Sequence, residues 1–274
     1  MVIQSSLDRQ KLKFIICSLL AMTGALFSGC QQVDRPESAS NQASTSNSQG
    51  KWDGEIQQFG EMHEVIGMQQ HEGRVKLSEL VAQPHFYGVG AIEGLKGELT
   101  ILDGKILATS APTQAELTPI HVTDETQATL LIGDHVDQWT PIELDADYVG
   151  SAFEDQIKKL AQQQGLDTSK PFPFWIKGPI LNMEFHVIRG ACPVHAQKKG
   201  IELSDDEKPF HHHVDQVDGQ LVGVFALGAA GKITHPGTSM HVHVVFTEDQ
   251  QTNEITGHLE RFGVAKGAVL YLPK

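Results

Sequence analysis

Short apolar runs separated by glycines and polar turns recur along this chain, and they predict a protein built mainly of strands. Between His85 and Leu107, glycines at positions 88, 90, 94, 97 and 104 divide the apolar residues, which is typical of a β-meander with tight turns. Further apolar runs predict strands at 130–132, 171–180, 185–188, 219–227 and 264–272.

Helical periodicity is clear in one segment. From Tyr148 to Gln164, apolar residues such as Phe153, Ile157 and Ala161 recur at helical spacing, and Gly165 is a suitable C-cap. A short helix is also expected near 78–81. The pattern therefore predicts a strand-dominated α+β fold with few helices.

Two histidines lie within the most regular of the predicted strands. His241 and His243 alternate with Val242 and Val244, so both imidazoles should point to one face. Gly257-His258 opens the next predicted strand, and pairing of the two strands would bring His258 to the first two. Three converging imidazoles are the protein ligands of a catalytic zinc site with an open fourth position.

The N-terminal segment 1–29 has the composition of a secretory signal. Basic residues precede an apolar core at 14–27, which is shorter than a transmembrane helix. The core ends in Leu26-Phe27-Ser28-Gly29-Cys30, which resembles a bacterial lipobox, although Phe27 stands where Leu is commonest. We expect an exported lipoprotein anchored to the cell envelope through Cys30; an ordinary secretory signal is the alternative. Residues 30–51, rich in Ser, Asn and Gln, are expected to form a disordered tether before a folded region at 52–274.

Composition excludes several classes of function. The formal net charge of −13 argues against nucleic-acid binding. Three cysteines without a CxxC pair exclude a disulfide framework and a thiolate zinc site. The chain also lacks a phosphate-binding glycine loop and a Gly-x-Ser-x-Gly elbow, so nucleotide chemistry and serine hydrolysis are not expected.

Most of the 14 histidines need only an ordinary surface or core role. This applies to His63, His71, His85, His121, His135, His186, His195 and His235. The run His211-His212-His213 lies between polar flanks that predict a loop. Because consecutive strand positions point to opposite faces, at most two of these three side chains can bind one ion, and a metal-related role remains open.

A second interpretation of the histidine pair is a cupin metal motif. His241-x-His243-x4-Glu248 resembles the first metal motif of cupins, which are β-barrels that bind iron or manganese. The second cupin motif requires Pro-x-Gly before a further histidine, and His258 lacks it. The cupin alternative is weakened but stays open at this point.

Three segments in the same order resemble α-acetolactate decarboxylase, a zinc enzyme that converts 2-acetolactate to acetoin. They are 87–104, with its Gly-rich turn and Leu-Asp-Gly; 219–225; and His-x-His followed by Gly-His at 241–258. The resemblance spans roughly residues 60 to 272. It implies mixed or antiparallel sheets in two closely packed halves, and a homodimer. It also implies His241, His243 and His258 as zinc ligands, and Glu98 as an active-site glutamate.

The chain departs from the family pattern at three places. Ala91 stands where the family has Thr, and Lys177 falls where the family has an arginine that meets the substrate carboxylate. No match is found before Lys274 for a glutamate that the family's C-terminal tail supplies. An ammonium grips a carboxylate with less control than a guanidinium, so Lys177 would hold the substrate more loosely, with Arg189 as a substitute if it points inward.

The resemblance implies decarboxylation of 2-acetolactate through a metal-stabilised enediolate. Glu98 would exchange protons with this species, and Lys177 would hold the departing carboxylate. Two alternatives remain: a zinc-binding relative that acts on another small keto or hydroxy acid or performs hydrolysis, and a non-catalytic metal-binding envelope lipoprotein.

Overall fold

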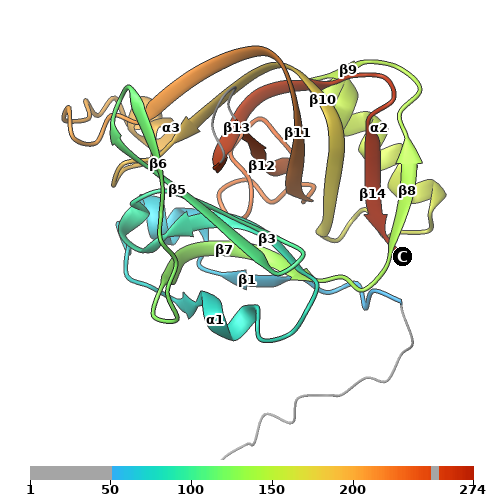
Figure 1. The fold of residues 1–274 in the computed structure, drawn as a ribbon, viewed down its shortest axis with the longest axis horizontal. Helices are drawn as coiled ribbons and strands as arrows, with labels where there is room; N and C mark the ends of the chain where they lie inside the picture. Colours follow the sequence, from blue (N-terminus) through green and yellow to red (C-terminus); the bar gives the residue numbers. More distant parts are fainter. Residues whose placement is uncertain (1–50, 248–252) are drawn as a thin grey trace, which may run out of the picture. The chain divides into compact units, whose positions relative to one another are not determined.

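Two seven-stranded antiparallel sheets make up most of the structure, one above the other in Figure 1. The computed structural model describes residues 51–247 and 253–274, which belong to one unit of the chain. The expected signal segment and the tether up to residue 50 lie outside the described residues, as does Glu248. None of the described helices is long and apolar enough to cross a membrane.

The first sheet contains the predicted meander. Strands β3, β4, β5 and β6 are consecutive neighbours, and β7 pairs with the other edge of β3. Sharp turns between them use residues at positive φ, such as Gly104 at 77°, a conformation that glycine adopts without strain. The strands are β1 (Gln57–Phe59), β2 (Val75–Lys76), β3 (Phe86–Ile92), β4 (Glu98–Leu102), β5 (Lys105–Thr113), β6 (Glu116–Pro119) and β7 (Gln127–His135).

The second sheet closes on itself. Strand β10 pairs with β11 along its length, while its other edge pairs first with β14 and then with β13. Because β11, β12 and β13 also pair in that order, strands β10 to β13 form a closed ring. The strands are β8 (Trp139–Glu143), β9 (Tyr148–Val149), β10 (Phe172–Val187), β11 (Phe210–Phe225), β12 (Met240–Thr247), β13 (Glu254–Val264) and β14 (Val269–Pro273).

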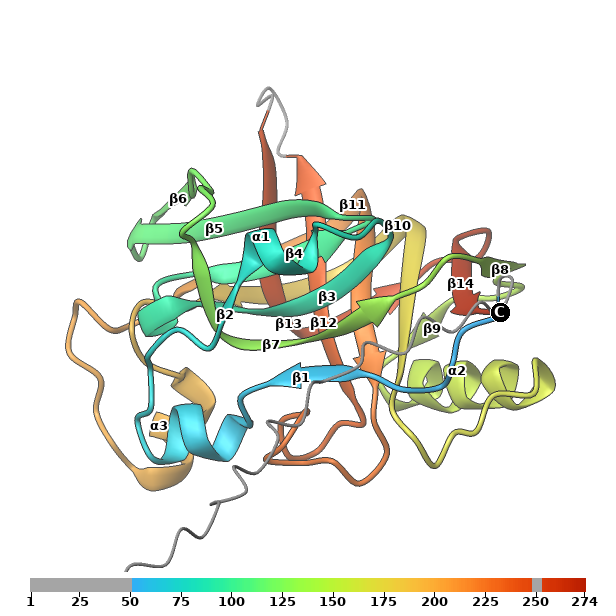
Figure 2. The same ribbon diagram turned by 90° about the horizontal axis from the view of Figure 1, so that it is seen from below.

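Helices are short and lie outside the sheets. The longest, α2 (Ser151–Gln163), buries Phe153, Ile157 and Ala161 at four-residue spacing and ends before Gly165, whose φ is 82°. The others are a π-helix (His63–Gly67), α1 (Leu77–Leu80), a 3-10 turn (Glu93–Leu95) and α3 (Pro193–Lys199). The strand-dominated α+β class is therefore confirmed, and helices occur within 148–164 and near 78–81 as predicted, although the first begins three residues later (Figure 2).

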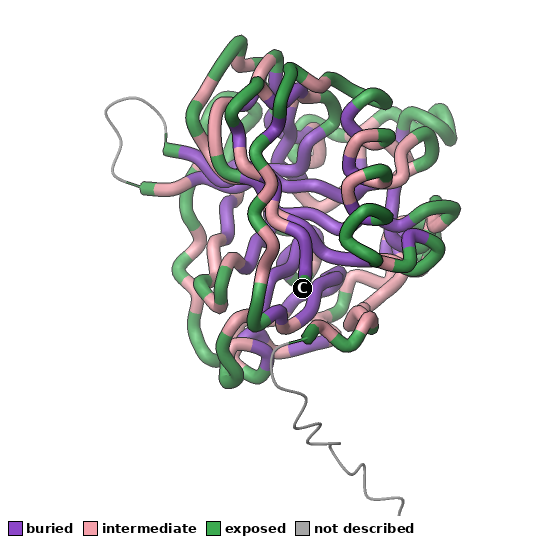
Figure 3. Tube along the Cα trace, turned by 90° about the vertical axis from the view of Figure 1, so that its right-hand side faces the viewer, coloured by how far each residue is buried: buried purple, intermediate pink, exposed green. Residues whose placement is uncertain are grey.

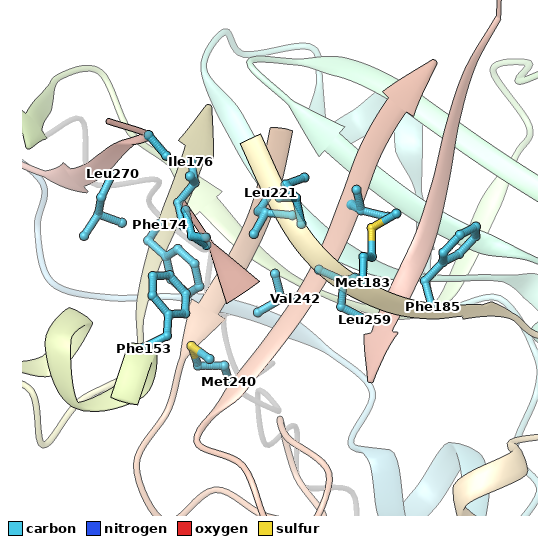
Figure 4. Close-up of a cluster of buried hydrophobic side chains, with 14 of the residues drawn as sticks. Phe153, Phe174, Ile176, Met183, Phe185, Leu221, Met240, Val242, Leu259 and Leu270 are labelled. Atoms are coloured by element: carbon cyan, nitrogen blue, oxygen red, sulfur yellow. The ribbon is translucent and has the colours of Figure 1, made fainter. Parts of the chain in front are cut away.

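Apolar side chains form one core inside the second sheet and another between the two sheets. In the first, Phe153 of α2 packs with Phe174, Met240 and Val242 (Figure 4). In the second, Val89 of β3 packs with Val222 and Val224 of β11 and with their neighbours. Figure 3 shows the buried strands surrounded by exposed turns. The two faces of the second sheet are thus both covered, which explains its long apolar runs.

Three local predictions were wrong. The run 264–272 is two strands, because Gly267 at a φ of 86° forms a turn between them. The segment 211–213 belongs to β11 and is no loop, since β10 pairs with it throughout. The helix begins at Ser151 because Gly150, at a φ of 55°, separates it from the short strand β9.

Candidate metal centre

His241 and His243 lie on the face of β12 that points to the first sheet. The intervening Val242 belongs to the core inside the second sheet, while Thr100 of β4 contacts His243 with its hydroxyl, 3.2 Å from Nδ1. Both histidines are buried. The predicted alternation is therefore confirmed, and it places two imidazoles in the layer between the sheets.

His258 completes the group from the neighbouring strand. It lies opposite His243 in the β12–β13 ladder, and the centroids of the three rings are 5.0 to 5.4 Å apart. One nitrogen from each ring lies within 4.8 Å of the other two. Because residues opposite each other in an antiparallel pair share a face, the hairpin brings all three predicted ligands together.

The protonation state of these imidazoles suits a cation. Burial lowers the pKa of His241 to about 3 and lowers the pKa of His243 and of His258 well below the usual value. All three rings are therefore neutral at pH 7 and offer lone pairs. Nδ1 of His241 and Nε2 of His243 are buried without a hydrogen-bond partner, which is costly unless an ion binds there. The donor set fits a divalent metal that accepts imidazole nitrogen.

Glu98 lies beside the histidines as the first residue of β4. Its Oε2 is 3.5 Å from Nε2 of His243, and its Oε1 accepts the backbone N–H of Ile188 at 3.2 Å. Burial raises the pKa of Glu98 to about 7, although His186 and the Ile188 N–H oppose the shift. A carboxyl group with this pKa can both hold and release a proton near neutral pH.

A small cavity lies beside the histidine group, and two further histidines, His186 and His235, line it. His186 of β10 directs Nε2 to Glu98, 3.9 Å from Oε1, and Nδ1 to Glu260, 2.8 Å from Oε1. His235 packs edge-on against His258 with ring centroids 5.0 Å apart. The sequence pattern predicts only ordinary roles for both residues. Their placement depends on strand register and loop path, for which the local pattern contains no signal.

The rest of the cavity wall is largely apolar. Ala91, paired with Glu98 across the β3–β4 ladder, lies there with Leu95, Leu130 and Ile188. Apolar walls exclude water and raise the strength of every electrostatic interaction inside the site. Because Ala91 stands where the family pattern has Thr, this part of the wall has a methyl group and no hydroxyl.

The structure does not bring Lys177 to this group. Its side chain is exposed, on the stretch of β10 that pairs with β14, whereas His186 lies on the stretch that pairs with β13. Arg189 does not replace it, because its guanidinium donates to four backbone carbonyls, those of Ala111, Pro112, Asp205 and Lys208. Neither cation is among the residues that line the cavity.

The fold is similar to those of solved α-acetolactate decarboxylases. The Bacillus subtilis strain 168 enzyme is 19% identical with a TM-score of 0.58, and the alignment covers 80% of this chain and 85% of that chain. The enzyme from Bacillus subtilis subspecies spizizenii is 18% identical with a TM-score of 0.59, covering 80% and 86%. A Staphylococcus aureus protein of unknown function, similar to α-acetolactate decarboxylase, is 16% identical with a TM-score of 0.53, covering 80% and 84%. At these identities the likeness shows the fold alone.

Sequence comparison gives the family itself. No curated protein matches the chain significantly. The sequence pattern that defines the alpha-acetolactate decarboxylase family, in contrast, matches residues 58–272. This span contains Glu98 and all three histidines of the metal centre. By this match, the chain belongs to the alpha-acetolactate decarboxylase family.

Proposed function

We propose that this protein is a zinc-dependent decarboxylase that converts 2-acetolactate to acetoin and CO₂. The observation that supports it best is the convergence of three neutral, buried imidazoles on a buried carboxyl group, Glu98, whose pKa is about 7. Family membership and the fold shared with the Bacillus subtilis enzymes agree with it. The three histidines and Glu98 are buried in the layer between the two sheets.

His241, His243 and His258 would hold the metal. Imidazole nitrogen suits zinc, and three protein ligands leave one position open. When bound, the ion supplies a Lewis acid that polarises oxygens of a 2-hydroxy-3-keto acid. The hydroxyl of Thr100 lies 3.2 Å from Nδ1 of His243, while Nε2 has no hydrogen-bond partner. An ion bound at Nε2 would keep the proton on Nδ1, and the Thr100 hydroxyl is placed to accept it. Thr100 therefore fixes the orientation of one ligand.

Glu98 is the residue proposed to move the proton. Loss of CO₂ breaks a carbon–carbon bond and leaves its electron pair on the remaining fragment, so each turnover must deliver one proton to carbon. The protonated carboxyl group of Glu98 can donate it and be reprotonated from solvent. The N–H of Ile188 holds one carboxyl oxygen in place, and the apolar wall keeps the pKa near the working pH.

The test combines metal content with product formation. The purified protein should contain about one tightly bound zinc per chain and should release acetoin and CO₂ from 2-acetolactate. His241→Ala should lose both the tightly bound zinc and the activity. His121→Ala, at an exposed position, is the matched control and should keep both. Tightly bound zinc without acetoin formation would refute the substrate assignment and leave the metal centre in place.

A second candidate is decarboxylation of another small keto or hydroxy acid. It is favoured by one observation: no lysine or arginine is among the residues lining the cavity, so the wall provides no permanent cation for the carboxylate of 2-acetolactate. A panel of β-keto and 2-hydroxy acids, assayed for CO₂ release, distinguishes the two. The family match leaves the cupin interpretation without support.

A further inference from the structure

A row of four histidines crosses four adjacent strands of the second sheet. His211 of β11 lies opposite His186 of β10, which lies opposite His258 of β13, which in turn lies opposite His243 of β12. Successive ring centroids are 5.6, 4.9 and 5.4 Å apart. Opposite residues share a face of the sheet. The row therefore leads from the buried metal centre to a side chain, His211, that is 51% exposed.

Glu260 adds a carboxylate at the exposed end of this row. It lies two residues after His258 on β13, so it is the diagonal neighbour of His186. Its Oε1 is 2.8 Å from Nδ1 of His186 and 3.5 Å from Nδ1 of His211. One donor atom from each of the three residues lies within 4.8 Å of the other two. None of the three belongs to the ligand set of the buried centre.

We propose that His186, His211 and Glu260 form a second binding site for a divalent transition-metal cation of the zinc class. Two imidazoles and one carboxylate match the preferences of such ions. Ligand distances of about 2.0–2.2 Å place tetrahedral donors about 3.3–3.6 Å apart. Small side-chain adjustments around the present 2.8 and 3.5 Å separations reach that geometry.

A hydrated cation can reach this site from solvent. A groove of about 590 Å³ lies alongside, and its lining includes Glu154, Glu184 and Glu260. Arg261 also lines it but is paired with Glu184, Nη2 to Oε2 at 2.9 Å. Glu260 is 33% exposed. Carboxylates that line a groove raise the local concentration of cations, so these surroundings favour binding of a divalent cation.

His186 links the two centres without being a ligand of the buried one. Its Nδ1 belongs to the second site, and its Nε2 faces Glu98 across 3.9 Å. A cation on Nδ1 would fix the proton on Nε2 and direct it at Glu98. The proposal concerns binding alone and does not depend on the reaction proposed above.

Metal stoichiometry tests the site. The purified protein, stripped of metal, is titrated with Zn²⁺ in competition with a chromophoric chelator. The expected result is two equivalents per chain, one tight and one weaker. His211→Ala and Glu260→Gln should each lose the weaker equivalent and keep the tight one. His241→Ala should lose the tight equivalent and keep the weaker one.

His213→Ala is the matched control for the exposed variants. This histidine lies on the same strand, is 51% exposed, and is hydrogen-bonded to Asp215 outside the group, so both equivalents should remain. A wild-type protein that binds a single equivalent would overturn the proposal. So would a weaker equivalent that survives in both His211→Ala and Glu260→Gln, because the ion would then lie elsewhere. Because the side chains of His211 and Glu260 are partly exposed, neither substitution should prevent folding. The two variants therefore test the same site independently.

Discussion

Thr100→Val isolates the contribution of one hydroxyl to the metal centre. Thr100 is fully buried, and valine has nearly the same shape. Oγ1 of Thr100 lies 2.6 Å from Oγ1 of Thr256 and 3.2 Å from Nδ1 of His243. The substitution therefore removes the Thr100 hydroxyl from two buried polar groups, the Thr256 hydroxyl and Nδ1 of His243.

The cost follows from these two groups. Each orphaned buried polar group costs about 1–3 kcal/mol, so with two such groups we expect the free energy of unfolding to fall by about 2–6 kcal/mol. At about 2–4 °C per kcal/mol for a domain of this size, that lowers Tm by about 4–24 °C. Loss of the hydrogen bond that orients His243 should also weaken zinc binding about 10–100-fold.

Thermal unfolding and competitive zinc titration measure the two effects. Thr129→Val is the control, because Thr129 is equally buried and its hydroxyl donates to the carbonyl of Glu72 at 2.9 Å, away from the centre. It should lower Tm and leave zinc affinity unchanged. Equal zinc affinity in Thr100→Val and wild type would refute the view that Thr100 orients a ligand.

Other substitutions test the proton donor, the exposed lysine and the packing. Glu98→Gln should lower the rate of acetoin formation about 10²–10⁴-fold with unchanged zinc content, and wild-type activity would exclude Glu98 from proton transfer. In metal-free protein, burial raises the pKa of Glu98 from 4.5 to about 7, so stability present below pH 4.5 is lost as the pH rises through 7. Urea unfolding should show wild type losing stability relative to Glu98→Gln over that window, and parallel curves would contradict the assignment. Lys177→Ala should leave kcat/KM within about twofold of the wild-type value, since the lysine side chain lies outside the cavity. A large loss of kcat/KM would show that Lys177 acts in the site. Gly90→Ala should lower unfolding free energy by about 1–3 kcal/mol in denaturant titration, because a Cβ there would lie 1.9 Å from the carbonyl oxygen of Leu130; an unchanged midpoint would contradict this.

Features that depend on local pattern were predictable from the sequence. Alternation placed His241 and His243 on one face, and helical spacing located α2, because both properties repeat within a few residues. Pairing of the two predicted strands added His258, and the family resemblance added Glu98; the structure places both beside the first two histidines.

Features that depend on pairing between distant strands were not predictable. His186 faces Glu98 only because β10 pairs with both β11 and β13, and no local pattern specifies that register. Register shifts between Leu181 and Phe185 in the β10–β13 ladder also prevent simple alternation along β10 from indicating which side chains point to the site. Lys177 was expected inside the site because it falls where the family pattern has an arginine, but its side chain is exposed.

The proposed metal ligands and the proposed acid come from separate parts of the fold. All three histidines belong to the β12–β13 hairpin, whereas Glu98 belongs to β4 in the other sheet. The separation between the three histidines and Glu98 is therefore set by how the two sheets pack, through residues such as Val89 and Val222. Substitutions that thin or thicken this layer should change turnover while metal content stays constant. The thickness of this interface would thus set the catalytic rate independently of the residues that hold the ion.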